Sequence, residues 1–150
     1  MKYAFVVFSI GLLVGAVPAA DSLNCRWVGA WPCGPSGAVA LDTERDLAFC
    51  ADHNAKVCVL DVADPARPSA LSSFVTGGYL GDIVYRANRL YVARGAYGFG
   101  VWDVANPSNP VPLGEIDTPG DAYGAAVAGS YAYVGDFDSG LRSTCRTLTT

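Results

Sequence analysis

The sequence of 150 residues is poor in residues that favour helices or hold metal ions. Beyond the first two residues it contains two glutamates, one lysine, and no glutamine or methionine. Because Gly, Pro, Val, Ala, Tyr and Asp dominate instead, the chain is predicted to be all-β. His53 is the single histidine, and no C-x-x-C spacing occurs. This composition argues against a zinc site, and no metal or other cofactor is predicted.

The chain also lacks basic clusters and long apolar runs beyond its start. Ten Lys and Arg residues stand against fourteen Asp and Glu residues, which gives a formal net charge of −4. An acidic chain without a basic patch has no electrostatic footprint for nucleic acid. No apolar segment after residue 20 approaches the ~20 residues needed to cross a bilayer. We therefore expect neither a nucleic-acid partner nor a later transmembrane segment.

Residues 1–20 have the organisation of a secretory signal peptide. Lys2 precedes an apolar run from Tyr3 to Val14, and small residues follow as far as Ala20. The alternative is an uncleaved membrane anchor, for which the apolar run is short. The predicted location is secreted, periplasmic or at the cell surface.

Five cysteines follow this leader: Cys25, Cys33, Cys50, Cys58 and Cys145. Export permits disulfides, but an odd number leaves at least one thiol unpaired or paired between chains. Cys50 and Cys58 flank a turn symmetrically about Asn54, so a hairpin would place their Cβ atoms ~4.5–5.5 Å apart. A Cys50–Cys58 disulfide is predicted, and the alternative is two buried thiols.

A phrase of eleven residues occurs twice, as VLDVADPARPS (59–69) and VWDVANPSNPV (101–111), 42 positions apart. Its turn residues are Asp61, Asp64, Pro65 and Pro68 in the first copy and Asp103, Asn106, Pro107 and Pro110 in the second. The Asp-Pro and Asn-Pro pairs initiate turns, because the short side chain caps nearby N–H groups while proline fixes φ. The second proline of each copy suits the start of an edge strand. The aspartate inside each apolar strand is expected to accept backbone N–H bonds.

The 42-residue period predicts modules of four strands. First strands are expected at 38–41, 82–85 and 123–127, and second strands at 47–51, 89–93 and 131–135. Third strands are expected at 57–62 and 99–104, and fourth strands at 70–75 and 112–116. Four short antiparallel strands in each repeat predict β-propeller blades, incomplete here at about three blades.

The phrase V-x-D-V-x-[DN]-P-x-x-P, preceded by an aromatic strand and followed by GEIDTPG (114–120), resembles the LVIVD-repeat proteins. The resemblance covers nearly everything from about Cys25 to Arg142, and the repeat domain is assigned to residues 21–142. It implies a bacterial exported β-propeller with a binding or scaffold role and no established common activity.

The pattern breaks at residues 143–150, where Ser143-Thr-Cys-Arg stands in place of V-x-D-V. Two explanations stay open: an ordinary frayed terminus, or a truncated or frameshifted fragment of a longer propeller gene. Incomplete propellers leave the apolar faces of their end blades uncovered, so self-association through these faces is expected.

Two groups of polar residues are candidates for a catalytic or metal site. Asp136-x-Asp138-x-Gly140 resembles half of a calcium loop, but the later carboxylate is missing, which favours a solvated hairpin tip. Ser36, Asp52 and His53 have no G-x-S-x-G context, and His53 is interpreted as a polar turn residue.

The tyrosines Tyr79, Tyr97 and Tyr123 and the phenylalanine Phe137 fall at strand starts and turns. They are expected either to contact a peptide or sugar at the rim or to act as wedges between blades.

The strand positions that face the propeller axis are mostly Ala, Val, Leu and Ile, with Asp42, Asp82 and Arg86 as exceptions. This favours an exported, non-enzymatic module that presents loops for protein or glycan binding. The alternatives are a fragment of a propeller enzyme of hydrolase or lyase type, or a purely structural cell-surface protein.

Overall fold

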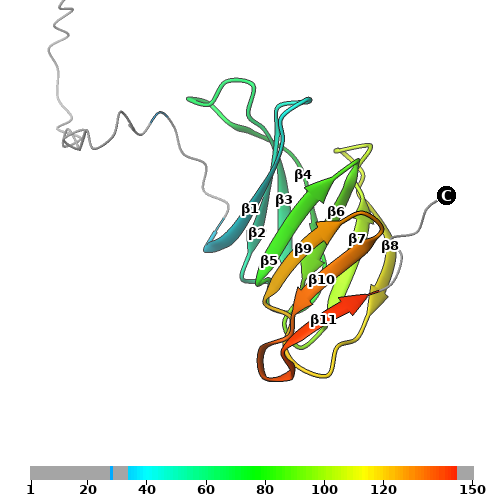
Figure 1. Ribbon diagram of the computed structural model, residues 1–150. Helices are drawn as coiled ribbons and strands as arrows, with labels where there is room; N and C mark the ends of the chain where they lie inside the picture. The colour runs from blue at the N-terminus through cyan, green and yellow to red at the C-terminus, as the bar shows by residue number, and fades with distance from the viewer. Residues whose placement is uncertain (1–27, 29–33, 145–150) are drawn as a thin grey trace, which may run out of the picture.

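The computed structural model describes residue 28 and residues 34–144 (Figure 1). The predicted signal peptide, the off-pattern residues after 144, and three of the five cysteines (Cys25, Cys33 and Cys145) lie outside the described residues.

Three antiparallel sheets make up the described fold. The first blade contains β1 (Ser36–Asp42), β2 (Leu47–Asp52), β3 (Lys56–Asp61) and β4 (Ser69–Val75). The second blade contains β5 (Asp82–Arg86), β6 (Arg89–Ala93), β7 (Phe99–Asp103) and β8 (Val111–Ile116). The third blade contains β9 (Gly124–Ala128), β10 (Tyr131–Gly135) and β11 (Leu141–Thr144), with a 3₁₀ turn η1 (Phe137–Ser139) before β11. The predicted all-β architecture with four-stranded blades is confirmed.

Each blade is a meander in which consecutive strands pair, and the blades lie side by side with their first strands adjacent (Figure 1). Strand β5 contacts both β1 and β9. This is how the inner strands of a propeller are arranged around its axis. Strand β11 includes Ser143 and Thr144, the first residues of the tail predicted to be off-pattern. The ladder extends into this tail because β pairing uses backbone groups, which do not depend on the family's side chains.

Both faces of the central blade are apolar because each face is covered by a neighbouring blade. Leu90 and Val92 of β6 face the first blade, where they join a buried cluster that includes Phe49. Tyr91 and Ala93, the alternate residues of the same strand, join the cluster formed with the third blade. Side chains alternate between the two faces of a strand, so a strand buried on both faces reads as a continuous apolar run.

The outer faces of the end blades expose apolar side chains. Val39 and Leu41 of β1 are 59% and 54% exposed, and Tyr131 and Leu141 of the third blade are 52% and 75% exposed. These faces correspond to those that pack between blades inside the chain.

The repeated phrase forms the loop between the third and fourth strands of its blade. Asp61, Asp64, Asp103 and Asn106 each accept, through Oδ1, the backbone N–H two residues later, at 2.8–3.1 Å. These short side chains therefore satisfy the donors that become free where the strand ends. The prolines Pro68 and Pro110 immediately precede the fourth strands β4 and β8.

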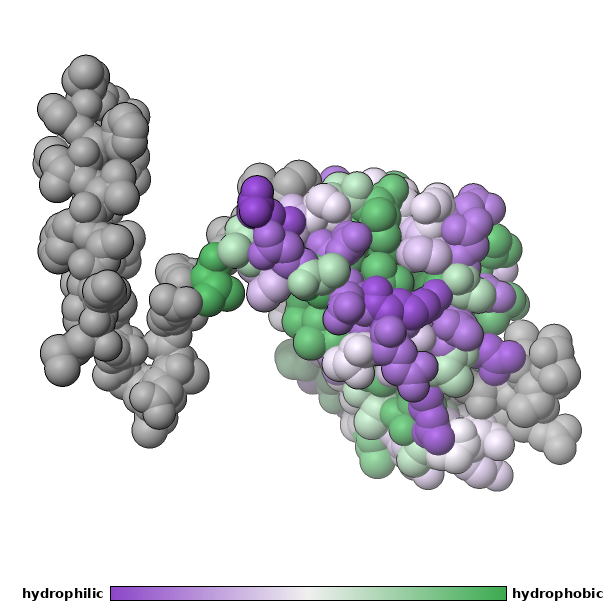
Figure 2. Space-filling view, turned by 90° about the horizontal axis from the view of Figure 1, so that it is seen from above, coloured by the Kyte–Doolittle hydropathy of each residue, from purple (hydrophilic) through white to green (hydrophobic). Residues whose placement is uncertain are grey.

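Arg45 connects the first two blades at the end of the molecule that carries these loops. Its guanidinium donates to the buried carboxylate of Asp42, to Tyr85 Oη at 3.3 Å, and to the carbonyl oxygens of Val104 and Ala105. Figure 2 shows this end, with hydrophilic residues gathered across its middle. Burial alone would raise the pKa of Asp42, but the hydrogen bonds and the charge of Arg45 outweigh it and lower that pKa.

Candidate ligand-binding site

Four aromatic side chains form a continuous row at the opposite end of the blades, which we call the aromatic row: His53, Tyr79, Tyr123 and Phe137. His53 stacks on Tyr79 with ring centroids 4.6 Å apart and an interplanar angle of 10°. Tyr79 meets Tyr123 edge to face at 5.9 Å, and Tyr123 meets Phe137 edge to face at 5.6 Å. His53 lies in the turn between β2 and β3, and Phe137 lies in η1. Tyr79 lies in the first inter-blade link (residues 76–81) and Tyr123 in the second (residues 117–123), so all three blades contribute to one surface.

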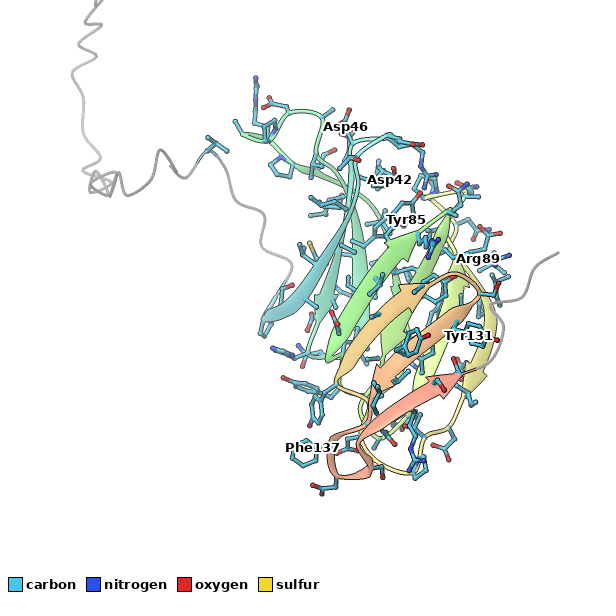
Figure 3. All side chains as sticks on the ribbon, in the orientation of Figure 1. Asp42, Asp46, Tyr85, Arg89, Tyr131 and Phe137 are labelled. Carbon is cyan, nitrogen blue, oxygen red and sulfur yellow. The ribbon has the colours of Figure 1, made fainter. Side chains whose placement is uncertain are left out.

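The row remains accessible even though its rings touch one another. Tyr79, Tyr123 and Phe137 are 46%, 43% and 67% exposed. Figure 3 shows Phe137 projecting at the lower end of the third blade. Tyr97 is separate from the row, because its ring lies against the backbone of Gly77 and Gly78. The sequence left two alternatives for these rings: contact with a ligand at the rim, or packing as wedges between blades. The row has features of both, because its rings pack against one another across blades and are also exposed to solvent.

Close backbone approach at two glycines positions the row. A Cβ atom at Gly81 would lie only 2.7 Å from the Cα and carbonyl oxygen of Tyr123. Gly95 has φ +56° and exchanges two backbone hydrogen bonds with Ala122, at 2.9 and 3.0 Å. Both positions require glycine, one for space and one for the left-handed conformation. Gly81 lets the first link approach Tyr123, and Gly95, in the turn between β6 and β7, binds Ala122 of the second link. These two contacts bring Tyr123 to Tyr79.

A concave site adjoins the row at Phe137. We call it the acidic pocket, and it is lined by Ala96, Asp117, Thr118, Pro119, Gly120, Asp121, Phe137, Asp138 and Ser139, with a volume of about 470 Å³. This volume lies within the ~300–1,000 Å³ range of small-ligand sites. Three of the lining side chains are carboxylates, and no lysine or arginine is among them.

Asp136 binds the pocket residue Gly120 and is buried, so it differs from the expected solvated hairpin tip. Its side chain is 0% exposed, and its Oδ2 accepts the N–H of Gly120 at 3.1 Å and lies 3.6 Å from Arg142 Nε. Oδ1 is buried without a hydrogen-bond partner. Phe137, Asp138 and Gly140 of the same hairpin tip are exposed.

Comparison with known proteins identifies the repeat. The family model for the LVIVD repeat matches residues 45–76, 77–118 and 119–142. The chain belongs to the LVIVD-repeat family.

Solved structures show the same kind of fold without sharing sequence with the LVIVD chain. The computationally designed Ika8 protein aligns with TM-score 0.61 and 11% identity over 73% of this chain and 33% of that chain. Sqt1 of Saccharomyces cerevisiae aligns with TM-score 0.60 and 8% identity over 76% of this chain and 31% of that chain. The LVIVD chain thus spans about a third of these structures, and identities this low show the fold alone. No curated protein matches the sequence.

One repeat position carries a buried charged residue in all three LVIVD repeats: Asp52, Arg94 and Asp136, spaced by 42 residues. Arg94 is 4% exposed and donates to the carbonyl oxygens of Thr76 at 2.7 Å and Tyr97 at 2.8 Å. Asp52 Oδ1 accepts the N–H of Asn54 at 2.6 Å. These residues organise the loops that carry the site. Arg94 is not among the predicted site residues, although its alignment with Asp52 and Asp136 in the repeat is a signal in the sequence.

The polar exceptions on the inner strands have structural partners. Asp82 accepts backbone N–H groups from Ile83 at 2.8 Å and from Ala125 of the next LVIVD repeat at 2.9 Å. Arg86 donates to the carbonyl of Val127 at 3.2 Å. Together with Asp42, which binds Arg45, these groups connect neighbouring blades.

The three candidate residues for a hydrolase site likewise each have a different structural partner. Ser36 Oγ donates to the carbonyl oxygen of Ala51 at 3.0 Å, Asp52 caps its own turn, and the His53 ring stacks on Tyr79. Sequence reasoning treated His53 as a polar turn residue and missed this stacking.

Cys50 lies directly opposite Cys58 in the β2–β3 ladder. This is the facing arrangement expected from their symmetry about Asn54, and the disulfide between them stays a prediction.

Within residues 34–144, no group of three or more His, Cys, Asp or Glu side chains is arranged to hold a metal ion. The part of the chain that the structure describes also contains no helix of the length and apolarity needed to span a membrane.

Proposed function

We propose that this protein is an exported, non-enzymatic LVIVD-repeat module that binds a protein or glycan ligand at the aromatic row. The observation that carries the proposal is the row itself, in which three exposed rings and His53 from three blades form one surface. Water-exposed aromatic rings gathered beside a concave pocket are typical of recognition surfaces.

The inner strands support binding in preference to catalysis. A propeller enzyme would place polar groups near the axis with free donors and acceptors for a substrate. Asp82 and Arg86 are instead engaged in contacts with the next blade, and Asp42 binds Arg45, which reaches the second blade. Export is supported by the predicted signal peptide at residues 1–20.

The test is a binding screen with the purified secreted chain on peptide and glycan arrays. Substitution Tyr123→Ala should abolish or strongly weaken the strongest interaction, because Tyr123 contacts both of its neighbours in the row. Tyr131→Ala is a matched control, since Tyr131 is 52% exposed but lies away from Phe137 (Figure 3). The ligand recovered from the complex should keep its original mass. Chemical conversion of the ligand, or equal binding by Tyr123→Ala, would refute the proposal.

A further inference from the structure

We infer that the aromatic row and the acidic pocket bind a single ligand, a basic peptide segment that places a lysine or arginine side chain in the pocket. This inference rests on the proposed function and specifies the class of ligand. It is carried by three observations: the charge of the pocket, the position of Phe137, and the orientation of the rings.

The pocket has a net negative charge that the described residues do not neutralise. Asp117 and Asp138 are exposed and Asp121 is half-buried. The ion pairs within the described chain involve other acidic residues: Asp42, Asp64, Glu115 and Asp136. Three carboxylates in one concavity repel one another, and a cationic group between them relieves this repulsion. The complementary ligand is therefore cationic.

Phe137 joins the pocket to the row. It lines the pocket beside Asp138 and contacts Tyr123 at 5.6 Å. A lysine or arginine side chain among the carboxylates would lie next to its ring, where the apolar stem packs and the cationic head is attracted to the π face. Phe137 is also 67% exposed and has φ +35°, a backbone conformation that is uncommon for a bulky residue. The chain thus presents this ring to solvent in an unfavourable conformation, as is common at binding sites.

The ring orientations favour a peptide over a sugar. A pyranose needs an open aromatic face on which to stack, but the stacking of His53 on Tyr79, at an interplanar angle of 10°, occupies one face of each ring. The two further contacts are edge to face, so the rings form a corrugated surface. Such a surface suits the separate side chains of an extended peptide, which rise on alternate sides of its backbone.

The experiment is fluorescence anisotropy of the full secreted chain with a fluorescein-labelled peptide of alternating lysine and glycine. A peptide with glutamate in place of lysine is the charge control. We expect binding of the lysine peptide alone, and weaker binding as NaCl rises above ~0.15 M, because exposed charges are screened over ~8 Å at that salt concentration.

The double variant Asp117→Asn/Asp138→Asn should weaken binding roughly threefold to tenfold, as expected for the loss of two exposed charge pairs. The matched control Glu44→Gln/Asp46→Asn makes the same change in net charge at the opposite end, where Figure 3 shows Asp46, and should bind like the wild type. All four residues are exposed, so the fold should be unchanged, which equal thermal unfolding midpoints would verify.

Equal affinity of the pocket variant and the wild type for the lysine peptide would overturn the inference, as would equal binding of the glutamate peptide. Binding of a neutral N-acetylglucosamine oligomer or of a glucosamine oligomer in a Tyr123-dependent manner, without lysine-peptide binding, would also overturn it. In that case the proposed function would stand. If no peptide or glycan depends on Tyr123, both the proposed function and the inference fail.

Discussion

Substitution of Asp42 by Asn tests the ion pair that holds Arg45 in position to bind the second blade. Asp42 is 3% exposed, and its carboxylate accepts the Nε–H of Arg45 and the backbone N–H of Glu44. Asparagine has nearly the same shape and keeps one acceptor oxygen. Its amide, however, replaces the second acceptor with a donor and removes the negative charge that balances Arg45.

The expected loss is about 2 kcal/mol of unfolding free energy. A hydrogen bond to a charged group contributes ~1.5–3 kcal/mol, and breaking a buried ion pair costs ~3–5 kcal/mol. The lower part of this range applies because the Arg45 side chain is 31% exposed and regains solvation in the variant. At ~4–8 °C per kcal/mol, the unfolding midpoint should fall by roughly 8–16 °C.

The effect should depend on pH in a defined direction. The pKa of Asp42 in the folded chain is lowered from its ordinary value of 3.8. The stabilisation is therefore fully present above the unfolded-state pKa and is lost as the pH falls through the folded-state pKa, which lies below 3.8. The difference between wild type and Asp42→Asn should be constant near neutral pH and shrink as the solution becomes more acidic than this value.

Urea unfolding followed by tryptophan fluorescence measures the difference, since Trp102 is buried between the same two blades. Asp46→Asn, an exposed substitution in the adjacent turn, serves as the control and should change stability by less than about 0.5 kcal/mol. An Asp42→Asn variant as stable as the wild type at neutral pH, or a stability difference that persists at low pH, would refute the reasoning.

Three further predictions concern the core, the cysteines and the turns. Phe49→Ala should lower the unfolding free energy by ~3–5 kcal/mol in urea titration, because Phe49 is fully buried and stacked on Tyr85 at 5.4 Å; a loss below about 1 kcal/mol would contradict this. Peptide mapping of the unreduced purified protein should recover Cys50 and Cys58 in one linked fragment, and separate fragments carrying free thiols would disprove the bridge. Asp103→Ala should cost about 1 kcal/mol, because its Oδ1 accepts an N–H at 2.8 Å, whereas Asp103→Asn should retain most of the stability.

The sequence period predicted the strands closely because every blade depends on the same local chemistry. Strand β6 occupies the predicted residues 89–93, and β1 extends the predicted 38–41 to Ser36–Asp42. Apolar residues on both faces and turn residues at fixed offsets determine these boundaries. Strand pairing inside a meander then follows from the short connections.

The candidate site was only partly predictable, since it depends on contacts that do not repeat. Tyr79 and Tyr123 are 44 residues apart, two more than the period, so alignment of the repeats does not pair them. Their contact arises from the close approach of the link at Gly81, which leaves no pattern in a single sequence. The exposed aromatic residues were recognised as candidates, but the stacking of His53 required the relative placement of two loops.

The contact of Arg45 with the second blade has a consequence for how such chains diversify. Its acceptors there include the main-chain oxygens of Val104 and Ala105, which every amino acid provides. Mutations in that loop can therefore accumulate without removing these acceptors, as long as the path of the chain is kept. A second blade taken from a related protein should therefore still bind Arg45 without matching side chains in this loop. Exchange of whole blades is thus a practical route to new specificities.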